Sequence, residues 1–163
     1  ADKIEAIAKE QKIKAEIGQA KISGNIDRIE RSASGEIVIA DLKTGASAPS
    51  QTSMDSENAQ LALYQLAFEH GGALAIPGYQ DGDRLVGATL IFPGAKKVLT
   101  QSSLNAEANS ALQAMWLEKV QVAVRGMAMS DGFFLANIDS HCHDDNSYGD
   151  CKLFLTEAVS HAG

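Results

Sequence analysis

Apolar and charged side chains alternate with a two-residue period over residues 12–17 and again over residues 20–30, with Gly18 between the two runs. No other feature of the sequence constrains the fold as much, because side chains two apart project from the same face of a β-strand. The two runs and the turn between them predict a β-hairpin. A third run over residues 36–43, which contains Ile-Val-Ile, predicts another strand.

The remaining elements are predicted from apolar periodicity. Residues 55–70 and 106–127 carry apolar side chains at helical spacing, and each predicts a helix. Residues 84–92 are largely apolar and stop at a Pro-Gly pair, which predicts a fourth strand. Apolar residues at helical spacing in 4–8 predict a short helical turn. The resulting order predicts a single α/β domain over residues 1–163, with a central mixed β-sheet flanked by helices.

Length and charge exclude several classes of protein. The 163 residues contain no apolar run of the roughly 20 residues that a transmembrane helix needs. The net charge of −7 argues against a protein that coats nucleic acid, whose surface is usually basic. The charge is uneven, because residues 1–60 hold 8 basic and 10 acidic side chains and are nearly neutral. The excess acid therefore lies in the second half of the chain.

Two carboxylates and a lysine form the first candidate site. Asp41 and Lys43 lie two apart at the end of an apolar strand, so that both side chains point to the same face. Asp27 lies on the preceding strand, and a hairpin would bring it beside Asp41. Carboxylates suit Mg²⁺, and a lysine can orient a water molecule or neutralise developing charge. Taken alone, Asp41 and Lys43 would also suit an ordinary surface ion pair.

A polar pair on the next helix extends this candidate site. Gln60 and Tyr64 are four residues apart on one helical face, which alone would also suit the polar edge of a packed helix. Taken in order, however, GNIDRIE, IVIADLKTG and QLALYQLA resemble the motifs of the RecB-type nuclease branch of the PD-(D/E)xK superfamily, as in RecB-like and AddB-like proteins. The resemblance implies a restriction-endonuclease-like α/β core.

The resemblance also implies a role for each residue of the site. Asp27 and Asp41 would bind Mg²⁺ or Mn²⁺, with the main-chain carbonyl of Leu42 as a further ligand. Lys43 would position the attacking water for metal-assisted hydrolysis of a phosphodiester bond. Gln60 and Tyr64 would lie beside the active site, where they would support Lys43 or touch the DNA backbone.

At the level of the whole protein, the resemblance implies a Mg²⁺-dependent deoxyribonuclease. The expected function is that of the exonuclease domain of a bacterial helicase–nuclease in double-strand-break repair and recombination. Its partners would be DNA and a helicase domain or subunit, in the bacterial cytoplasm and without a membrane. Residues 1–163 would then be an excised C-terminal fragment. The alternatives are a catalytically inactive DNA-binding module of the same fold, and a stand-alone or CRISPR-associated nuclease of the same family.

The N-terminal segment departs from the family pattern. Relatives usually carry a further His or Glu metal ligand on a helix before the hairpin. Residues 1–11 offer Glu5 and Glu10 but no histidine. Either the chain begins after that helix, or the site lacks this ligand.

The C-terminal segment departs as well. Relatives often end in a cysteine run that binds an iron–sulfur cluster, together with one upstream cysteine. Cys142 and Cys151 match two positions of that run, but Asp145 occupies the middle one and no upstream cysteine exists. We therefore expect a degraded cluster site without a cluster. Ordinary thiols, a Cys142–Cys151 disulfide, and a zinc site that also uses His141 and His143 are the alternatives.

Overall fold

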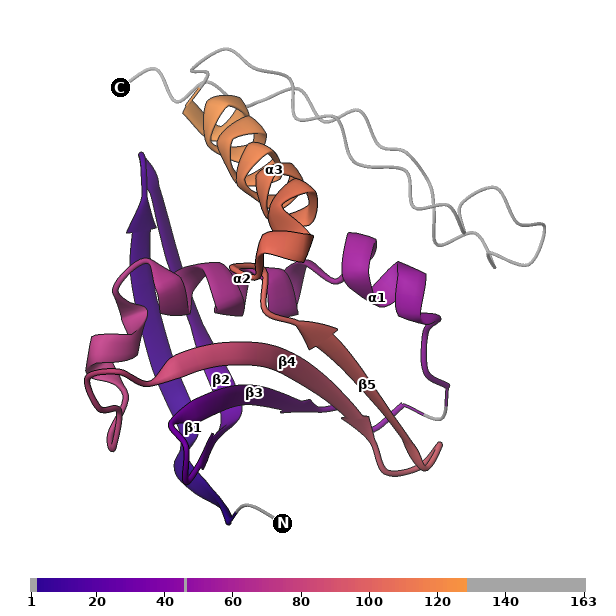
Figure 1. Ribbon diagram of the computed structural model, residues 1–163. Helices are drawn as coiled ribbons and strands as arrows, with labels where there is room; N and C mark the ends of the chain where they lie inside the picture. The colour runs from indigo at the N-terminus through magenta and orange to yellow at the C-terminus, as the bar shows by residue number, and fades with distance from the viewer. Residues whose placement is uncertain (1–2, 46, 129–163) are drawn as a thin grey trace, which may run out of the picture. The chain divides into compact units, whose positions relative to one another are not determined.

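The structure is a computed structural model that describes residues 3–45 and 47–128 (Figure 1). The chain divides into two compact units, residues 1–121 and 122–163, and the fold and the site described below belong to the first. Cys142 and Cys151 lie outside the described residues, so the prediction of a degraded cluster site stays a prediction.

A five-stranded mixed sheet forms the centre of the first unit. The strands follow one another across the sheet in chain order, and β3 and β4 are parallel while the other neighbouring pairs are antiparallel. This confirms the predicted α/β class with a mixed sheet. The strands are β1 (Ile4–Ile17), β2 (Ala20–Ser32), β3 (Glu36–Leu42), β4 (Arg84–Phe92) and β5 (Lys97–Ser102).

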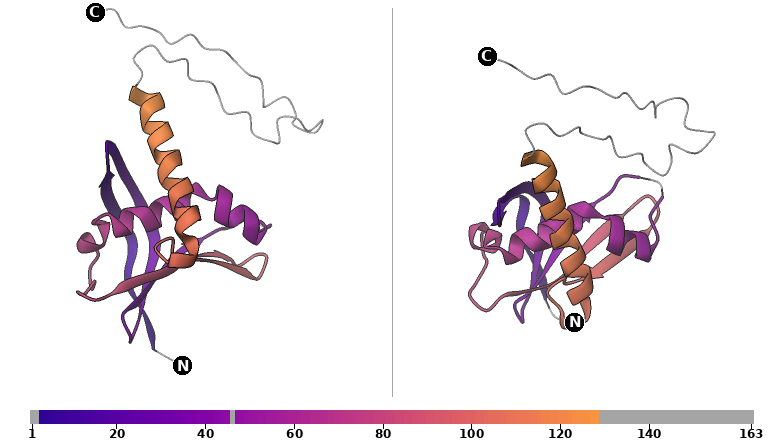
Figure 2. Two further views of the ribbon diagram at one scale, coloured as in Figure 1. Left: turned by 45° about the horizontal axis from the view of Figure 1, so that its top comes forward. Right: turned by 90° about the horizontal axis from the view of Figure 1, so that it is seen from above.

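Helices α1 (Gln51–Glu57) and α2 (Ala59–Glu69) make a second layer (Figure 1). In Figures 1 and 2, α1 and α2 lie along the same side of β4 and β5, and the β1–β2 hairpin extends past α2. None of the helices within the described residues is long and apolar enough to cross a membrane. The helical elements are α1 (Gln51–Glu57), α2 (Ala59–Glu69), the 3₁₀ turns η1 (Gly72–Ala75) and η2 (Glu107–Asn109), and α3 (Ser110–Ala128).

The predicted helical turn near the N-terminus is wrong, because these residues begin β1. The pairing of β1 with β2 shifts register between Ala6 and Ala8. Such a bulge inserts one residue and interrupts the two-residue alternation. Ile4, Ile7 and Ala8 thereby acquire a spacing that imitates a helix.

Two further elements differ from the sequence prediction, the helix predicted over residues 55–70 and the strand β5. The single helix predicted over residues 55–70 is two helices, because the side chains of Ser50 and Asn58 cap α1 and α2 by accepting backbone N–H groups. Strand β5 escaped prediction because one of its two inward positions is the polar residue Gln101. This side chain is buried and accepts a hydrogen bond from Gln65 Nε2 at 2.6 Å.

The core fills the space between the sheet and α2. It is dominated by fully buried branched side chains, including Ile13, Ile29 and Ile39 from the first three strands. A close contact lies where β1 passes Gly72, at the start of η1. A Cβ atom at this glycine would lie 2.5 Å from Ile13 Cγ1 and 2.6 Å from Ala67 O.

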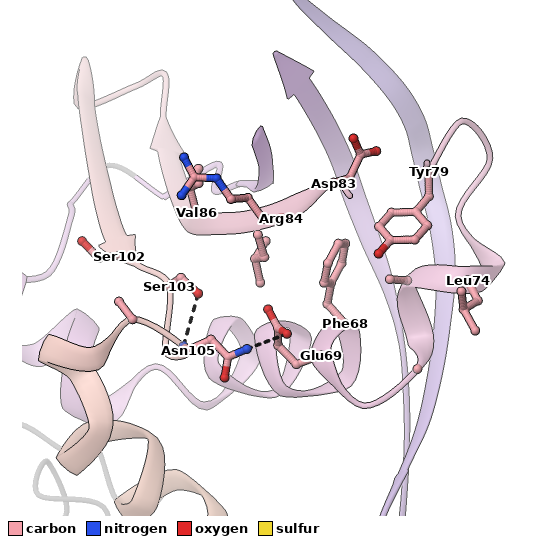
Figure 3. Close-up of a pocket in the computed structure, with 14 residues that line it drawn as sticks. Phe68, Glu69, Leu74, Tyr79, Asp83, Arg84, Val86, Ser102, Ser103 and Asn105 are labelled. Carbon is pink, nitrogen blue, oxygen red and sulfur yellow. Dashed lines mark hydrogen bonds between the residues drawn. The ribbon is translucent and has the colours of Figure 1, made fainter. Parts of the chain in front are cut away.

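A cavity of about 640 Å³ lies at the end of the sheet where β4 begins (Figure 3). Its walls include Phe68 and Tyr79, whose rings meet edge to face. Glu69 accepts a hydrogen bond from Asn105 Nδ2 at 2.7 Å at one side of this cavity. Partial burial raises the pKa of the Glu69 carboxyl, and the charge of the neighbouring His70 opposes this rise.

We expect Gly72→Ala to lower the free energy of unfolding by about 1–3 kcal/mol, because the added methyl group clashes with a backbone oxygen and a core side chain. Urea denaturation followed by circular dichroism measures this change. Gly94→Ala is the matched control, because its Cβ atom would meet only Gly45 O at an ordinary 3.7 Å. An equal loss in both variants would contradict the close crossing at Gly72.

We expect Glu69→Gln to stabilise the protein relative to the wild type at neutral pH but not in acid. A carboxyl with a raised pKa binds its proton more readily in the folded state, so the wild type loses stability as the pH rises above the ordinary glutamate pKa. Glutamine keeps the oxygen that accepts from Asn105 and does not titrate. Thermal unfolding between about pH 4 and pH 7 should show the two melting curves diverging as the pH rises.

Candidate active site

The candidate site begins at the end of the parallel pair β3 and β4. Asp41 follows Ile37 and Ile39 at two-residue spacing, so its carboxylate continues a buried apolar face. Asp41 is 1% exposed. A carboxylate in this position needs partners, because burial of an unpaired charge is costly.

Asp27 reaches the same place from β2. The pairing between β2 and β3 ends with Arg28 opposite Ala40, and one further step in this register places Asp27 opposite Asp41. Here the Asp27 side chain lies against the neighbouring strand, and its Oδ2 accepts the N–H of Leu42 at 2.9 Å. The structure thus brings the carboxylate of Asp27 to the backbone that follows Asp41.

Lys43 and Gln60 provide the partners of Asp41. Lys43 Nζ lies 2.7 Å from Asp41 Oδ2 and donates to Gln60 Oε1, also at 2.7 Å. Gln60 Nε2 in turn donates to Asp41 Oδ1 at 3.0 Å. The three side chains therefore form a closed ring of contacts. Because the Lys43 side chain is 34% exposed, the ring is open to solvent on the lysine side.

Tyr64 joins this ring to β2. Its hydroxyl accepts from Gln60 Nε2 at 3.1 Å and donates to the main-chain carbonyl of Asn25. The ring of Tyr64 packs on Gly24, where a Cβ atom would lie 2.8 Å from Tyr64 Cε1. A side chain at position 24 would therefore push the tyrosine away from Gln60.

The donor atoms suit a divalent cation held by few protein ligands. Asp41 Oδ2 contacts Lys43 Nζ but accepts no hydrogen bond of good geometry in the part of the chain that the structure describes, although it is buried. Asp27 adds a half-buried carboxylate beside it. Two carboxylates are a common Mg²⁺ donor set, because this ion keeps several of its waters. The main-chain carbonyl of Leu42 stays a predicted ligand.

The additional ligand expected from relatives has no counterpart in the part of the chain that the structure describes. Glu5 and Glu10 lie on β1 rather than on a helix. Among residues 3–45 and 47–128, no three His, Cys, Asp or Glu side chains gather in a way that could hold a metal ion. The site as described therefore rests on Asp27 and Asp41.

Sequence reasoning found the charged members of the site but missed its backbone partners. The N–H of Leu42 donates to Asp27 and the carbonyl of Asn25 accepts from Tyr64, and neither backbone group has a residue-type signal. Gly24 had one, because a single glycine inside a strand often marks a close approach by another group. In this protein the approaching group is the ring of Tyr64.

A comparison with known protein families identifies the family of the chain. The family model of the PD-(D/E)XK nuclease superfamily matches residues 2–151. No curated protein gives a significant match to the chain. The match spans most of the chain and includes Asp27, Asp41 and Lys43, which have the residue types that the family is named for. The chain therefore belongs to the PD-(D/E)XK nuclease superfamily.

Proposed function

We propose that the protein hydrolyses phosphodiester bonds of DNA in a reaction that depends on Mg²⁺ or Mn²⁺. The observation that carries this proposal is the contact network of Asp41, Lys43 and Gln60 beside the carboxylate of Asp27. It unites negative oxygen donors with a partly exposed ammonium group at one strand end. Membership of a nuclease superfamily supports the same reaction.

Each residue has a distinct task in this reaction. Asp27 and Asp41 would hold the metal ion, which supplies Lewis-acid polarisation of the phosphoryl oxygens. Lys43 orients the attacking water and neutralises charge that develops on the phosphoryl group. Gln60 keeps the ammonium group of Lys43 in place, since it contacts both Lys43 and Asp41. Tyr64 fixes Gln60 through its hydroxyl group.

For the biological setting, we propose an exonuclease domain of a bacterial helicase–nuclease that acts in double-strand-break repair and recombination, in the cytoplasm. The support is the RecB-like spacing of the three sequence motifs. A helicase domain or subunit would deliver the DNA strand. The second candidate is a catalytically inactive DNA-binding module. It is favoured by the fact that, among the described residues, no third carboxylate or histidine joins Asp27 and Asp41 at the site.

We expect Asp41→Asn and Lys43→Gln each to lower the rate of Mg²⁺-dependent DNA cleavage by a factor of roughly 10²–10³ or more, because each removes charge from the reacting centre. Release of labelled nucleotides from linear DNA measures the rate. The matched control is Glu36→Gln, which neutralises a carboxylate at the other end of β3 and should leave the rate unchanged. Full activity in the Asp41 and Lys43 variants would refute the assignment, and binding without cleavage in the wild type would favour the inactive module.

We also expect Mn²⁺ to raise the melting temperature of the wild type, because an ion that binds only the folded state stabilises it. At a Mn²⁺ concentration of about 100 times the Kd, the free energy of unfolding rises by about 2.7 kcal/mol. Asp27→Asn should abolish most of this gain, since it removes one of the two carboxylates. Differential scanning fluorimetry with and without EDTA measures the effect. An equal gain in the wild type and the variant would place the ion elsewhere.

A further inference from the structure

A hollow of about 630 Å³ lies against the distal part of the β1–β2 hairpin, where it meets the end of α2. Lys14, Glu16, Lys21, Ser23 and His70 contribute polar groups to its lining, while Ala15 is among the apolar groups. We name this site the lysine hollow. Its lining holds two lysines and one glutamate, so its formal charge is positive, although the chain as a whole has a net charge of −7.

Glu16, which also lines the lysine hollow, compensates its two lysines only weakly. Lys14 forms no ion pair with any residue that the structure describes. Lys21 lies 3.9 Å from Glu16, but both side chains are mostly exposed, at 85% and 74%. Such an exposed pair contributes little stability, so both lysines are available to an anion from outside.

Strand β2 and helix α2, which border the lysine hollow together with β1, also lead to the candidate active site. Along β2, Asp27 lies four residues beyond Ser23, which corresponds to about 13 Å in a strand. Along α2, Gln60 lies ten residues before His70, which corresponds to about 15 Å in a helix. Tyr64, which packs on Gly24, joins the two elements midway. Both routes place the lysine hollow at a similar distance from the candidate active site, about 13–15 Å. Figure 1 shows that the hairpin extends past α2.

Resting on the proposed nuclease function, we propose that the lysine hollow binds backbone phosphates of the DNA strand whose bond is cut at Asp27 and Asp41. Ammonium, hydroxyl and imidazole groups are typical phosphate contacts, and they do not read the base sequence. One strand of B-form DNA rises about 3.4 Å per nucleotide, so the separation corresponds to about four nucleotides. The hairpin would therefore hold the strand at a fixed distance from the cut.

Binding without cleavage tests this proposal. A fluorescein-labelled oligothymidylate of about 20 nucleotides is titrated in EDTA, and fluorescence anisotropy gives the Kd between about 50 and 200 mM salt. Lys14→Gln/Lys21→Gln should raise the Kd by roughly tenfold or more at low salt. It should also make the slope of log Kd against log salt shallower by about 1.4, because each lost phosphate contact is worth about 0.7 on a single strand.

The matched control is Lys3→Gln/Arg84→Gln, which removes two exposed positive charges where β1 and β4 begin. It should keep the wild-type Kd within about twofold, because most of the electrostatic effect of distant exposed charges is screened. An equal loss of affinity in the control would show that only net charge matters and would overturn the proposal.

Other outcomes separate this proposal from the nuclease function. A wild type that cleaves DNA with Mg²⁺ but does not bind the oligonucleotide in EDTA overturns the role of the lysine hollow and leaves the nuclease function standing. If the wild type binds the oligonucleotide but never cleaves DNA, and the double variant loses binding, the nuclease function fails and the role of the lysine hollow stands. If the double variant binds normally but self-associates in light scattering, the lysines protect the edge of the hairpin from pairing with other strands, and the proposal fails.

Discussion

The ion pair between Asp41 and Lys43, completed by Gln60, is the contact on which the rest of the site depends. A carboxylate that is 1% exposed would be strongly disfavoured without a partner, yet it lies on the same face as Ile37 and Ile39. Because Lys43 and Gln60 compensate it, strand β3 can carry an apolar core face and end in a charged group. The same compensation fixes the direction in which both Asp41 oxygens point.

The ending of the β2–β3 ladder gives the site its second carboxylate. Beyond the pair Arg28 and Ala40, the carboxylate of Asp27 accepts the N–H of Leu42. A side chain thus reaches across to the neighbouring strand where regular pairing stops. Chemistry and secondary structure are therefore coupled, because the place where the sheet opens is also the place where two carboxylates can meet.

The sequence predicted the parts of this arrangement that follow from residue type and period. Strand β4 was predicted with the correct bounds, and β2 and β3 with nearly correct ones, because their apolar residues recur without interruption. Strand β1 begins eight residues before the predicted strand, because the bulge near its start interrupts the two-residue period. Strand β5 could not be predicted from period, since its inward Gln101 is satisfied by Gln65, a partner distant in sequence. Nor could the contacts of Asn25 and Leu42, which use backbone atoms that every residue possesses.

The packing of Tyr64 on Gly24 links two motifs that are forty residues apart in the chain. Neither residue can vary freely, because the space that a larger residue at position 24 would need is already filled by the aromatic ring. We therefore expect the two positions to change together among relatives. Relatives that replace the glycine should therefore carry a smaller residue in place of the tyrosine, and a search for such paired exchanges would separate members with this site architecture from those that hold the helix glutamine in another way.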